Sequence, residues 1–367
     1  MGFNCGIVGL PNVGKSTLFN ALTSTAAAQA ANFPFCTIEP NVGRVAVPDA
    51  RLTKISGIAK SKETIPTQLE FVDIAGLVKG ASRGEGLGNK FLANIREVDA
   101  IVHVLRCFDD GNITHVDGSI DPVRDAETVE TELMIADLES LEKRADALTK
   151  KAKSGDKDAK DQLAVIDPAL AALREGKPAR TARPDDENAL KLFRQLQLLT
   201  AKPVLYACNV EEGNAANGNA LSAKVEEKAV AENALCVVVS AAIEAEVSQL
   251  DDPEERQDFL ETLGLEETGL TRVIRAGYEL LDLLTFFTVG PKEARAWTVR
   301  GGAKAPQAAG AIHTDFERGF IRAETIAYDD FVNLGGEQAA KDAGKMRQEG
   351  KEYLVKDGDI MHFLFNV

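Results

Sequence analysis

Short apolar runs alternate with helical stretches in two parts of this chain, one at the N-terminus and one after residue 200. The runs have the length of buried strands and lie at 5–8, 69–74, 100–105, 203–208 and 235–239. Helices are predicted to begin at Leu18 and to cover 253–263 and 270–281. Buried strands that alternate with helices are typical of a mostly parallel sheet flanked by helices. We therefore expect an α/β fold in these two parts.

Between the two parts, the hydrophobic positions change to a helical spacing. Apolar residues over 134–152 lie alternately four and three positions apart, and the alternation repeats over 159–173. This pattern predicts an antiparallel coiled-coil hairpin that turns at 154–156. Pro168 is expected to kink or interrupt its second arm, and a third amphipathic helix is expected over 188–199. The pattern fits a packed helical subdomain and a partner-contacting arm equally well.

The last part of the chain has a different order of elements. Two strand-like runs, 283–289 and 295–300, precede a helix that contains 308–312, and strands follow near 320–326 and 359–365. Two strands, a helix and further strands is the order of a ubiquitin-like β-grasp. The expected boundaries are 1–125 and 200–281 for the α/β domain, 126–199 for the helical coiled-coil insertion and 282–367 for the β-grasp domain.

Length, charge and cysteine use narrow the class of protein. A chain of 367 residues exceeds one typical core. No apolar run approaches the ~18 residues of a membrane span, and the N-terminus lacks a signal pattern, so we expect a cytoplasmic protein without a membrane partner. The net charge of −15 argues against a whole-surface grip on nucleic acid, although it allows a local basic patch. Five scattered cysteines fit reduced thiols better than disulfides or a metal site.

Residues 9–17, GLPNVGKST, match the phosphate-binding pattern G-x-x-x-x-G-K-[ST] between a predicted strand and a predicted helix. Gly14 lets the backbone approach a phosphate, and the loop N–H groups with the helix N-terminus form an anion site. Lys15 would reach the β- and γ-phosphates, Ser16 would ligate Mg²⁺ and Thr17 would contact the α-phosphate. The expected nucleotide-binding residues here are Asn12, Val13, Gly14, Lys15, Ser16 and Thr17.

Two further segments have the features of nucleotide-sensing loops. Thr37 lies in a proline-containing loop after the first helix and is the candidate second protein ligand of Mg²⁺. Asp73 ends a strand within an Asp-x-x-Gly sequence, where it would bond to the shell of the Mg²⁺ ion. The N–H of Gly76 would meet the γ-phosphate.

Leu77 changes the expected mechanism of hydrolysis. In Ras-like GTPases, the residue after Asp-x-x-Gly is a glutamine that orients the attacking water, and leucine cannot do this. His115, in the loop after the strand 100–105, is a candidate substitute because an imidazole can orient or deprotonate water. A lone loop histidine is also a common surface residue, so both interpretations stay open.

The strand 203–208 ends in Asn209-Val210-Glu211-Glu212, where GTPases have Asn-Lys-x-Asp. Valine lacks the lysine stem that covers the base, and Glu212 would not meet guanine as aspartate does. The sequence therefore favours ATP or relaxed base specificity. Backbone N–H groups at Ser240-Ala241, after the next strand, would frame the base.

These motifs together closely resemble the YchF family of Obg-like ATPases, along essentially the full length. The matching segments are 9–17, 32–41, 73–80, 209–212 and 304–310. The resemblance implies a G domain interrupted by the coiled-coil arm and followed by a TGS domain. It implies ATP over GTP, with the Val210 backbone contacting adenine, and Mg²⁺ at Ser16 and Thr37.

The same resemblance implies further properties. His115 is a proposed catalytic substitute, and Asn12 matches an asparagine that holds K⁺ in some relatives. The family associates with ribosomes, which implies a role in translation or stress responses. TGS domains often contact RNA or protein. The expected partners are therefore the ribosome, as its large subunit or the whole 70S particle, and RNA bound through the TGS domain and the coiled-coil arm. The candidate contact residues are Arg295, Arg300, Lys304, Arg318 and Arg322.

We therefore expect a monomeric, ribosome-associated ATPase that acts as a nucleotide-dependent switch and hydrolyses ATP slowly on its own. A rival hypothesis is a nucleotide-sensing scaffold or chaperone-like regulator, in which ATP binding matters and hydrolysis is incidental. Leu77 is consistent with both. A GTPase remains the outcome if the base argument fails, and a small-molecule P-loop kinase is disfavoured because the motifs form a GTPase-type set.

Overall fold

The structure, a computed structural model, describes residues 3–30, 42–74, 87–110, 118–250 and 252–366. The chain forms two compact units. The large unit comprises Phe3–Gly43 and Glu70–Leu280, and the C-terminal unit comprises Arg44–Leu69 and Leu281–Val367. Among the described helices, none has both the length and the apolar composition needed to cross a bilayer.

A six-stranded sheet, in the order β2-β4-β1-β5-β6-β7, forms the centre of the large unit. Its strands are β1 (Asn4–Val8), β2 (Val42–Ala46), β4 (Gln68–Asp73), β5 (Ala100–Arg106), β6 (Val204–Asn209) and β7 (Leu235–Val239). The pairs β1–β4, β1–β5, β5–β6 and β6–β7 are all parallel. Every residue of β5 and β6 is buried, as expected for a parallel sheet covered on both faces. The predicted α/β fold is confirmed.

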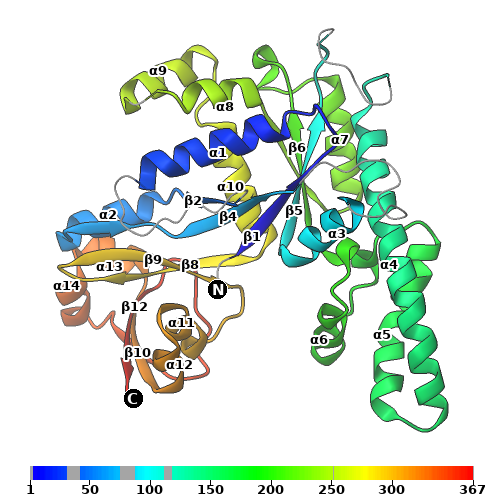
Figure 1. Cartoon of the computed structure of the whole chain (residues 1–367). Coiled ribbons are helices and arrows are strands. Elements are labelled where there is room, and N and C mark those ends of the chain that lie inside the picture. The colour runs from blue at the N-terminus through cyan, green and yellow to red at the C-terminus, as the bar shows by residue number, and fades with distance from the viewer. Residues whose placement is uncertain (1–2, 31–41, 75–86, 111–117, 251, 367) are drawn as a thin grey trace. The chain divides into compact units, whose positions relative to one another are not determined.

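Helices flank this sheet on two sides. Figure 1 shows α1 (Lys15–Ala30) and α10 (Gly269–Leu280) on one side of the strands, and α3 (Leu87–Glu97), α4 (Pro122–Lys153) and α7 (Ala220–Ala231) on the other. Two shorter helices, α8 (Ala241–Val247) and α9 (Pro253–Thr262), follow β7. Helix α8 packs against α1, so the segment after β7 lies beside the helix that follows β1.

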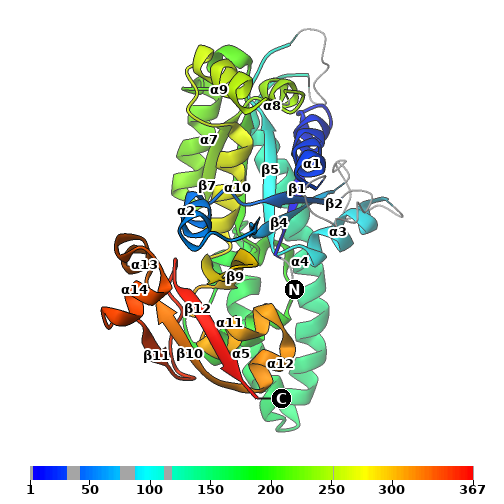
Figure 2. The ribbon, with the colours of Figure 1, turned by 90° about the vertical axis from the view of Figure 1, so that its left-hand side faces the viewer.

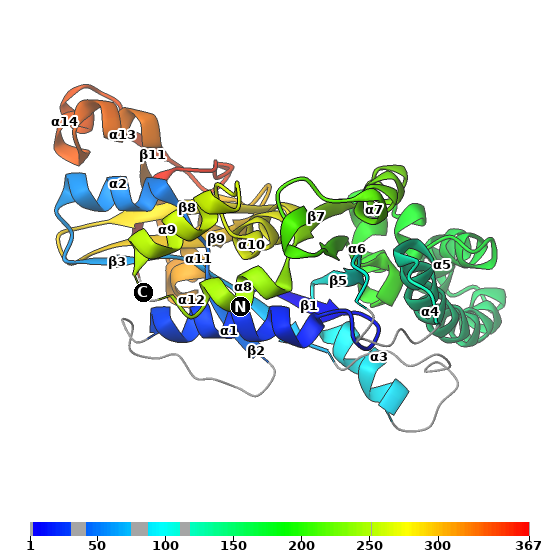
Figure 3. The same cartoon turned by 90° about the horizontal axis from the view of Figure 1, so that it is seen from above.

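The predicted antiparallel hairpin is formed by α4 and α5 (Lys157–Arg174), which lie side by side in Figure 3. Asp156 caps α5, because its carboxylate accepts a hydrogen bond from the Ala159 N–H at 3.1 Å. One buried cluster joins the two helices and includes Leu141, Ile166 and Leu170. The apolar stripe in the sequence therefore forms the hairpin's own core.

The structure refines two expectations for this region. Of the expected kink or interruption at Pro168, the interruption is absent: α5 continues through Pro168, and Ile166 and Ala169 beside it are completely buried. The third helix, α6 (Glu187–Gln195), is shorter than predicted. Gln197 has a left-handed backbone, with φ 52°, and this conformation cannot continue a right-handed helix.

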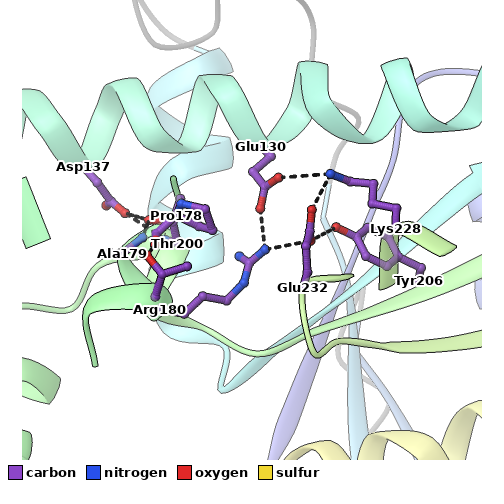
Figure 4. A network of polar contacts seen from close by, with 10 residues as sticks. Glu130, Asp137, Pro178, Ala179, Arg180, Thr200, Tyr206, Lys228 and Glu232 are labelled. Atoms are coloured by element: carbon purple, nitrogen blue, oxygen red, sulfur yellow. Dashed lines mark hydrogen bonds and ion pairs between the residues drawn. The ribbon is translucent and has the colours of Figure 1, made fainter. Parts of the chain in front are cut away.

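Charged side chains at the base of the hairpin connect it to the sheet (Figure 4). Arg180 donates to Glu130 at 2.5 Å and to Glu232 at 3.1 Å, while Lys228 pairs with Glu232. The Tyr206 hydroxyl on β6 donates to the same Glu232 at 2.8 Å. Burial alone would raise the pKa of Glu232, but the hydrogen bonds from Lys228 and Tyr206 lower it below its usual range. The network thus holds two carboxylates against two cations.

Asp137 on α4 makes a second anchor nearby (Figure 4). Its carboxylate accepts hydrogen bonds from the N–H of Leu199, the N–H of Thr200 and the Thr200 hydroxyl, at 2.7–2.9 Å. These bonds fix the segment by which the chain returns from the hairpin to β6. The hairpin is therefore tied to the sheet at both ends of its path.

A second six-stranded sheet, β11-β10-β12-β8-β9-β3, forms the C-terminal unit. Its strands are β3 (Glu63–Ile65), β8 (Leu283–Val289), β9 (Glu293–Arg300), β10 (Phe320–Ile326), β11 (Arg347–Glu349) and β12 (Ile360–Phe365). The β8–β9 hairpin is antiparallel, and the last strand, β12, lies between β8 and β10 and runs parallel to β8. This order confirms the predicted β-grasp.

Helices cover both faces of this second sheet. Figure 2 shows α11 (Ala305–Ile312) and α12 (Thr314–Arg318) on one side of β10 and β12, and α13 (Tyr328–Leu334) and α14 (Glu337–Asp342) on the other. Each side has its own buried cluster, with Phe286 in the first and Phe287 in the second. Adjacent phenylalanines on β8 point to opposite faces, as the alternation of a strand requires.

Residues 44–69 lie in the C-terminal unit, and not in the α/β domain where the sequence analysis placed them. Helix α2 (Ala50–Ala59) packs Leu52 and Ile55 into the cluster that contains Phe287. Strand β3 adds to the edge of the β-grasp sheet, parallel to β9. Arg51 pairs with Asp357 at 2.5 Å. The residues that α2 and β3 contact in the C-terminal unit are more than two hundred positions away in the sequence, so no local pattern predicted these contacts.

Candidate functional site

The phosphate-binding motif forms the expected strand–loop–helix between β1 and α1. Gly14 and Asn12 both have left-handed backbones, with φ 92° and 63°. Asparagine is one of the few side chains that tolerates this conformation. The Leu18 N–H donates to the Gly14 carbonyl at 3.0 Å, which starts the helix. Ser16 and Thr17 are exposed in the first turn, where unpaired N–H groups and the helix dipole favour an anion.

Lys15 forms an ion pair with Asp73, the last residue of β4. Both side chains are mostly buried, at 10% and 18% exposed. The lysine of the phosphate-binding motif and the aspartate of Asp-x-x-Gly therefore meet at one point, although 58 positions separate them. This is the pair of groups that a P-loop enzyme directs at phosphate and at the Mg²⁺ shell.

Asn209, at the end of β6, connects the phosphate-binding loop to the segment after β7. Its side-chain NH₂ donates to the Val13 carbonyl at 2.9 Å, and its carbonyl oxygen accepts from the Ala241 N–H at 2.9 Å. Asn209 as a whole residue is 5% exposed. A Cβ at Gly14 would lie 2.2 Å from the Asn209 nitrogen, so this bridge requires glycine there. The bond from Asn209 to Val13 spans 196 positions, and the base-motif pattern alone did not show it.

The other residues of the predicted base motif are Val210, Glu211 and Glu212. Val210 is 3% exposed, and its N–H already donates to the Val239 carbonyl at 2.9 Å. Any backbone contact from Val210 to a base therefore falls to its carbonyl oxygen. Glu212 is exposed at the start of a short 3₁₀ turn, and the neighbouring Glu211 accepts from the Asp109 N–H at 3.3 Å.

Ser240 has a buried hydroxyl at the predicted base-framing position. The residue is 2% exposed, and its Oγ has no hydrogen-bond partner within the described ranges. Buried hydroxyls in proteins are normally bonded. Because Ser240 adjoins Ala241, which binds Asn209, this unsatisfied hydroxyl lies next to the bridge to the phosphate-binding loop.

The residues present fit a Mg²⁺–nucleotide site in part. No cluster of three His, Cys, Asp or Glu side chains that could hold a metal occurs in the described portion of the chain. Mg²⁺ in P-loop sites does not need one, since hydroxyls, water and phosphate oxygens supply most ligands. At this site, Ser16 and Asp73 are described residues with side-chain oxygens for binding Mg²⁺ or its water ligands. The other predicted residues, Thr37, Gly76, Leu77 and His115, lie outside the described residues.

The cysteines in the described part of the chain are free thiols, as the sequence predicts. They are Cys5, Cys107, Cys208 and Cys236, and Cys36 lies outside the described residues. Burial raises the pKa of Cys5 to about 12, and the nearby Asp99 adds to this effect. Such a thiol is unreactive at neutral pH.

Comparison with known proteins identifies relatives of the whole chain. Residues 283–366 match a family model named for the C-terminal part of YchF GTPases and described as a protein of unknown function (DUF933). Residues 4–137 match a model described as a 50S ribosome-binding GTPase.

Two relatives named ribosome-binding ATPase YchF, from Escherichia coli and Bacillus subtilis, are 58% and 56% identical to this chain, with 100% of each chain covered. Among solved structures, the Schizosaccharomyces pombe YchF GTPase superposes with a TM-score of 0.88 at 39% identity, covering 99% of this chain and 98% of that one. Identity of this degree over the full length shows that the chain belongs to the YchF family.

Proposed function

We propose that this chain is a ribosome-associated, Mg²⁺-dependent ATPase that works as a nucleotide-dependent switch in the cytoplasm, in translation or stress regulation. The observation that carries the proposal is the convergence of Lys15, Asp73 and Asn209 on one end of the parallel sheet. Ligands of open α/β sheets bind at this edge, beyond the carboxyl ends of the strands. The names of the bacterial relatives supply the ribosome and the ATPase activity as expectations for this chain.

ATP is the proposed nucleotide because the base motif lacks the groups that select guanine. Val210 is buried and has no stem to cover a base, and the Glu212 side chain lies at the surface. The Ser240 hydroxyl, which lacks a bond in the described structure, is the proposed polar contact to the base. The Schizosaccharomyces pombe relative is named a GTPase and the bacterial relatives are named ATPases, so base preference is the property to measure.

The proposed Mg²⁺ ligands from the protein are Ser16 and Thr37, with Asp73 in the surrounding shell. The ion would neutralise charge on the β- and γ-phosphates. Lys15 would then exchange its bond with Asp73 for bonds to phosphate, which frees the aspartate for the shell of the ion. A K⁺ ion held near Asn12 would add positive charge beside the phosphates.

Slow hydrolysis without a partner follows from Leu77. The proposed roles are a γ-phosphate contact from the Gly76 N–H and orientation of water by His115. Replacing His115 with alanine separates an ATPase from a nucleotide-sensing scaffold. If the chain is an ATPase switch, the His115→Ala variant should lose the turnover that a partner stimulates. If the chain is a scaffold, the variant should keep its function in the cell.

The path of the chain supports a switch that acts on the C-terminal unit. In the sequence, Thr37 precedes β2 and Gly76 follows β4. Residues 44–69, which run from the end of β2 to the start of β4, belong to the C-terminal unit. A nucleotide-dependent change in either loop would therefore pull on a segment that belongs to the other unit.

Binding of fluorescent ATP and GTP analogues to Lys15→Ala, beside wild type and the control Lys54→Ala, tests the site. Lys54 is exposed on α2. We expect Lys15→Ala to lose nucleotide binding and Lys54→Ala to keep it. Equal binding by all three proteins would contradict the proposed site.

A further inference from the structure

Two ionisable side chains connect α8, which begins at the predicted base-framing segment, to α10. Glu244 on α8 is 2% exposed, and its Oε1 accepts a hydrogen bond at 2.6 Å from the N–H of Gly269, where α10 begins. Burial raises the pKa of this carboxyl group to about 7, while the N–H groups of Leu270 and Gly269 and the charge of Arg272 act in the opposite direction. Glu244 therefore ties α8 to the first turn of α10.

Arg272 on α10 reaches the chain directly after the base motif. One of its terminal nitrogens donates to the Ala215 carbonyl at 3.4 Å, and Ala215 follows the 3₁₀ turn Glu212–Asn214. Ala215 also lies in one buried cluster with Ile243 and Val247 of α8. The segment after β6 is therefore held twice, by α10 through a hydrogen bond and by α8 through apolar packing.

These contacts close into a ring with the bridge that Asn209 makes. The Asn209 side chain accepts from the Ala241 N–H, and α8, which contains Glu244, begins at Ala241. From Glu244 the contacts continue through α10 to Ala215, which lies on the same segment as Asn209. We define the contact ring by the residues that make these contacts: Asn209, Ala215, Ala241, Glu244, Gly269 and Arg272. The ring joins both segments of the predicted base site.

Capping of α10 does not by itself account for Glu244. Thr268 already caps this helix locally, because its hydroxyl accepts a hydrogen bond from the Thr271 N–H at 3.1 Å. Glu244 Oε2 and Arg272 Nε are both buried without a hydrogen-bond partner in the part of the chain that the structure describes. Burying ionisable groups with unused bonds is costly. Proteins accept such local costs mainly at functional sites.

We propose that Glu244 and Arg272 are positioning residues for the nucleotide base, and that the contact ring sets the preference for ATP. The inference rests on the proposed function, because it assigns a role within the proposed base site. Neither side chain touches the nucleotide in this proposal. Instead, the ring holds the segments after β6 and β7 in one arrangement before the base arrives. Binding groups that are already in place cost less to order when the ligand binds.

The phosphate contacts have a different origin. Lys15 and Ser16 are placed by the loop after β1 and by α1, and neither belongs to the contact ring. The bond from Asn209 to Val13 also remains when the ring is opened at Glu244 or Arg272. Opening the ring there should therefore weaken base recognition and leave phosphate binding intact. General damage to the fold would weaken both.

Calorimetric titration of the full-length protein with ATP, GTP and inorganic triphosphate, each with Mg²⁺, tests the proposal. The test variants are Glu244→Ala and Arg272→Ala. Their controls, Glu246→Ala and Arg275→Ala, remove exposed charges from the same two helices. We expect each test variant to bind ATP roughly 10-fold more weakly, because a buried hydrogen bond is lost, and to bind GTP and triphosphate as wild type does. The controls should match wild type for all three ligands.

Two further measurements separate positioning from a purely structural role. Glu244→Gln keeps an oxygen that can accept from the Gly269 N–H, so it should restore most of the ATP affinity. In steady-state hydrolysis, the KM of both test variants for ATP should rise while kcat stays unchanged, as expected when binding shared by the ground state and the transition state is lost. Thermal unfolding shows which variants fold, and Arg272→Ala, at a half-buried position, carries the test if Glu244→Ala does not fold.

Three results would overturn the proposal: unchanged ATP affinity in the folded test variants, equal weakening of all three ligands, or no recovery in Glu244→Gln. If wild type prefers ATP over GTP and triphosphate and the test variants keep this preference, only the contact ring fails. If wild type binds ATP no better than triphosphate, the proposed base site fails as well.

Discussion

Asn209 is the residue that makes the nucleotide site one structure. Its side-chain amide bonds to Val13 and to Ala241, so it ties the loop after β1 to the segment after β7. The bonds are buried, and a side chain at Gly14 would collide with them. The position that GTPases use beside the base thus also supports the phosphate-binding loop.

Replacing Asn209 with alanine should weaken ATP binding roughly 10- to 100-fold, because two buried hydrogen bonds are lost and Val13 and Ala241 are left without their partner. Titration with a fluorescent ATP analogue measures this loss. Asn188→Ala, at an exposed position on α6, is the matched control. An unchanged dissociation constant for Asn209→Ala would mean that the bridge does not organise the loop.

Glu244 on α8 should make stability depend on pH. Burial raises its pKa to about 7, although the N–H groups of Leu270 and Gly269 act in the opposite direction. Between its ordinary value of 4.5 and about 7, the folded state keeps a proton that the unfolded state releases. Stability therefore falls as pH rises through this window and levels off above it.

Glu244→Gln should flatten that dependence, since glutamine does not titrate. Urea unfolding at pH 5, 6 and 7.5 measures the slope, with the exposed Glu246→Gln as the control on the same helix. If wild type and Glu244→Gln change in parallel from pH 5 to 7.5, Glu244 does not titrate in this range.

Residues differ in how much the sequence reveals about them. Gly14, Lys15 and Ser16 were predictable because a short local motif specifies their shared role. The pairing of Lys15 with Asp73 follows from that motif only once the parallel sheet places the ends of β1 and β4 together. The bridge from Asn209 to Val13 was not predictable, since nothing in either segment specifies contact across 196 positions.

Among the elements, those with their own apolar periodicity were predictable. The two helices of the hairpin have it, and β5 and β6 are recognisable as continuous apolar runs. Helix α2 and strand β3 were missed because they complete a sheet formed by distant residues. The interruption expected as one outcome at Pro168 does not occur, because the burial of Ile166 and Ala169 outweighs the local cost of proline.

The segment 44–69 should behave as part of the C-terminal unit. Ile55 is fully buried with Phe287, so Ile55→Ala should cost about 2–5 kcal/mol. Hydrogen exchange should then accelerate at the amides of β8 and β9 and stay unchanged at β5 and β6. Faster exchange confined to β5 and β6 would show that the segment is packed with the large unit.

The base of the hairpin should be far more sensitive than its surface. Arg180→Ala leaves Glu130 and Glu232 without one of their cations, and we expect a loss of about 2–4 kcal/mol. Arg174→Ala, on the same hairpin, removes an exposed pair with Glu142 and should cost less than about 1 kcal/mol. Chemical unfolding of both variants measures the difference. Equal losses would mean that the network does not anchor the arm.

At the scale of the whole molecule, the order in which the chain enters the nucleotide site and the C-terminal unit matters for function. The site lies at the carboxyl ends of β1, β4 and β6 in the large unit. In the sequence, Thr37 precedes β2 and Gly76 follows β4, and most of the chain between these strands belongs to the C-terminal unit. A change at either predicted sensing loop would therefore act on a segment of the C-terminal unit, as a nucleotide-dependent switch requires.

Steady-state turnover of ATP and GTP by the purified protein, with and without ribosomes, tests this account most directly. We predict slow ATP hydrolysis by the free protein, well below the ~1–100 s⁻¹ of kinases, faster hydrolysis when ribosomes are added, and weaker use of GTP. Fast hydrolysis by the free protein, a clear preference for GTP, or no response to ribosomes would contradict a ribosome-associated ATPase switch.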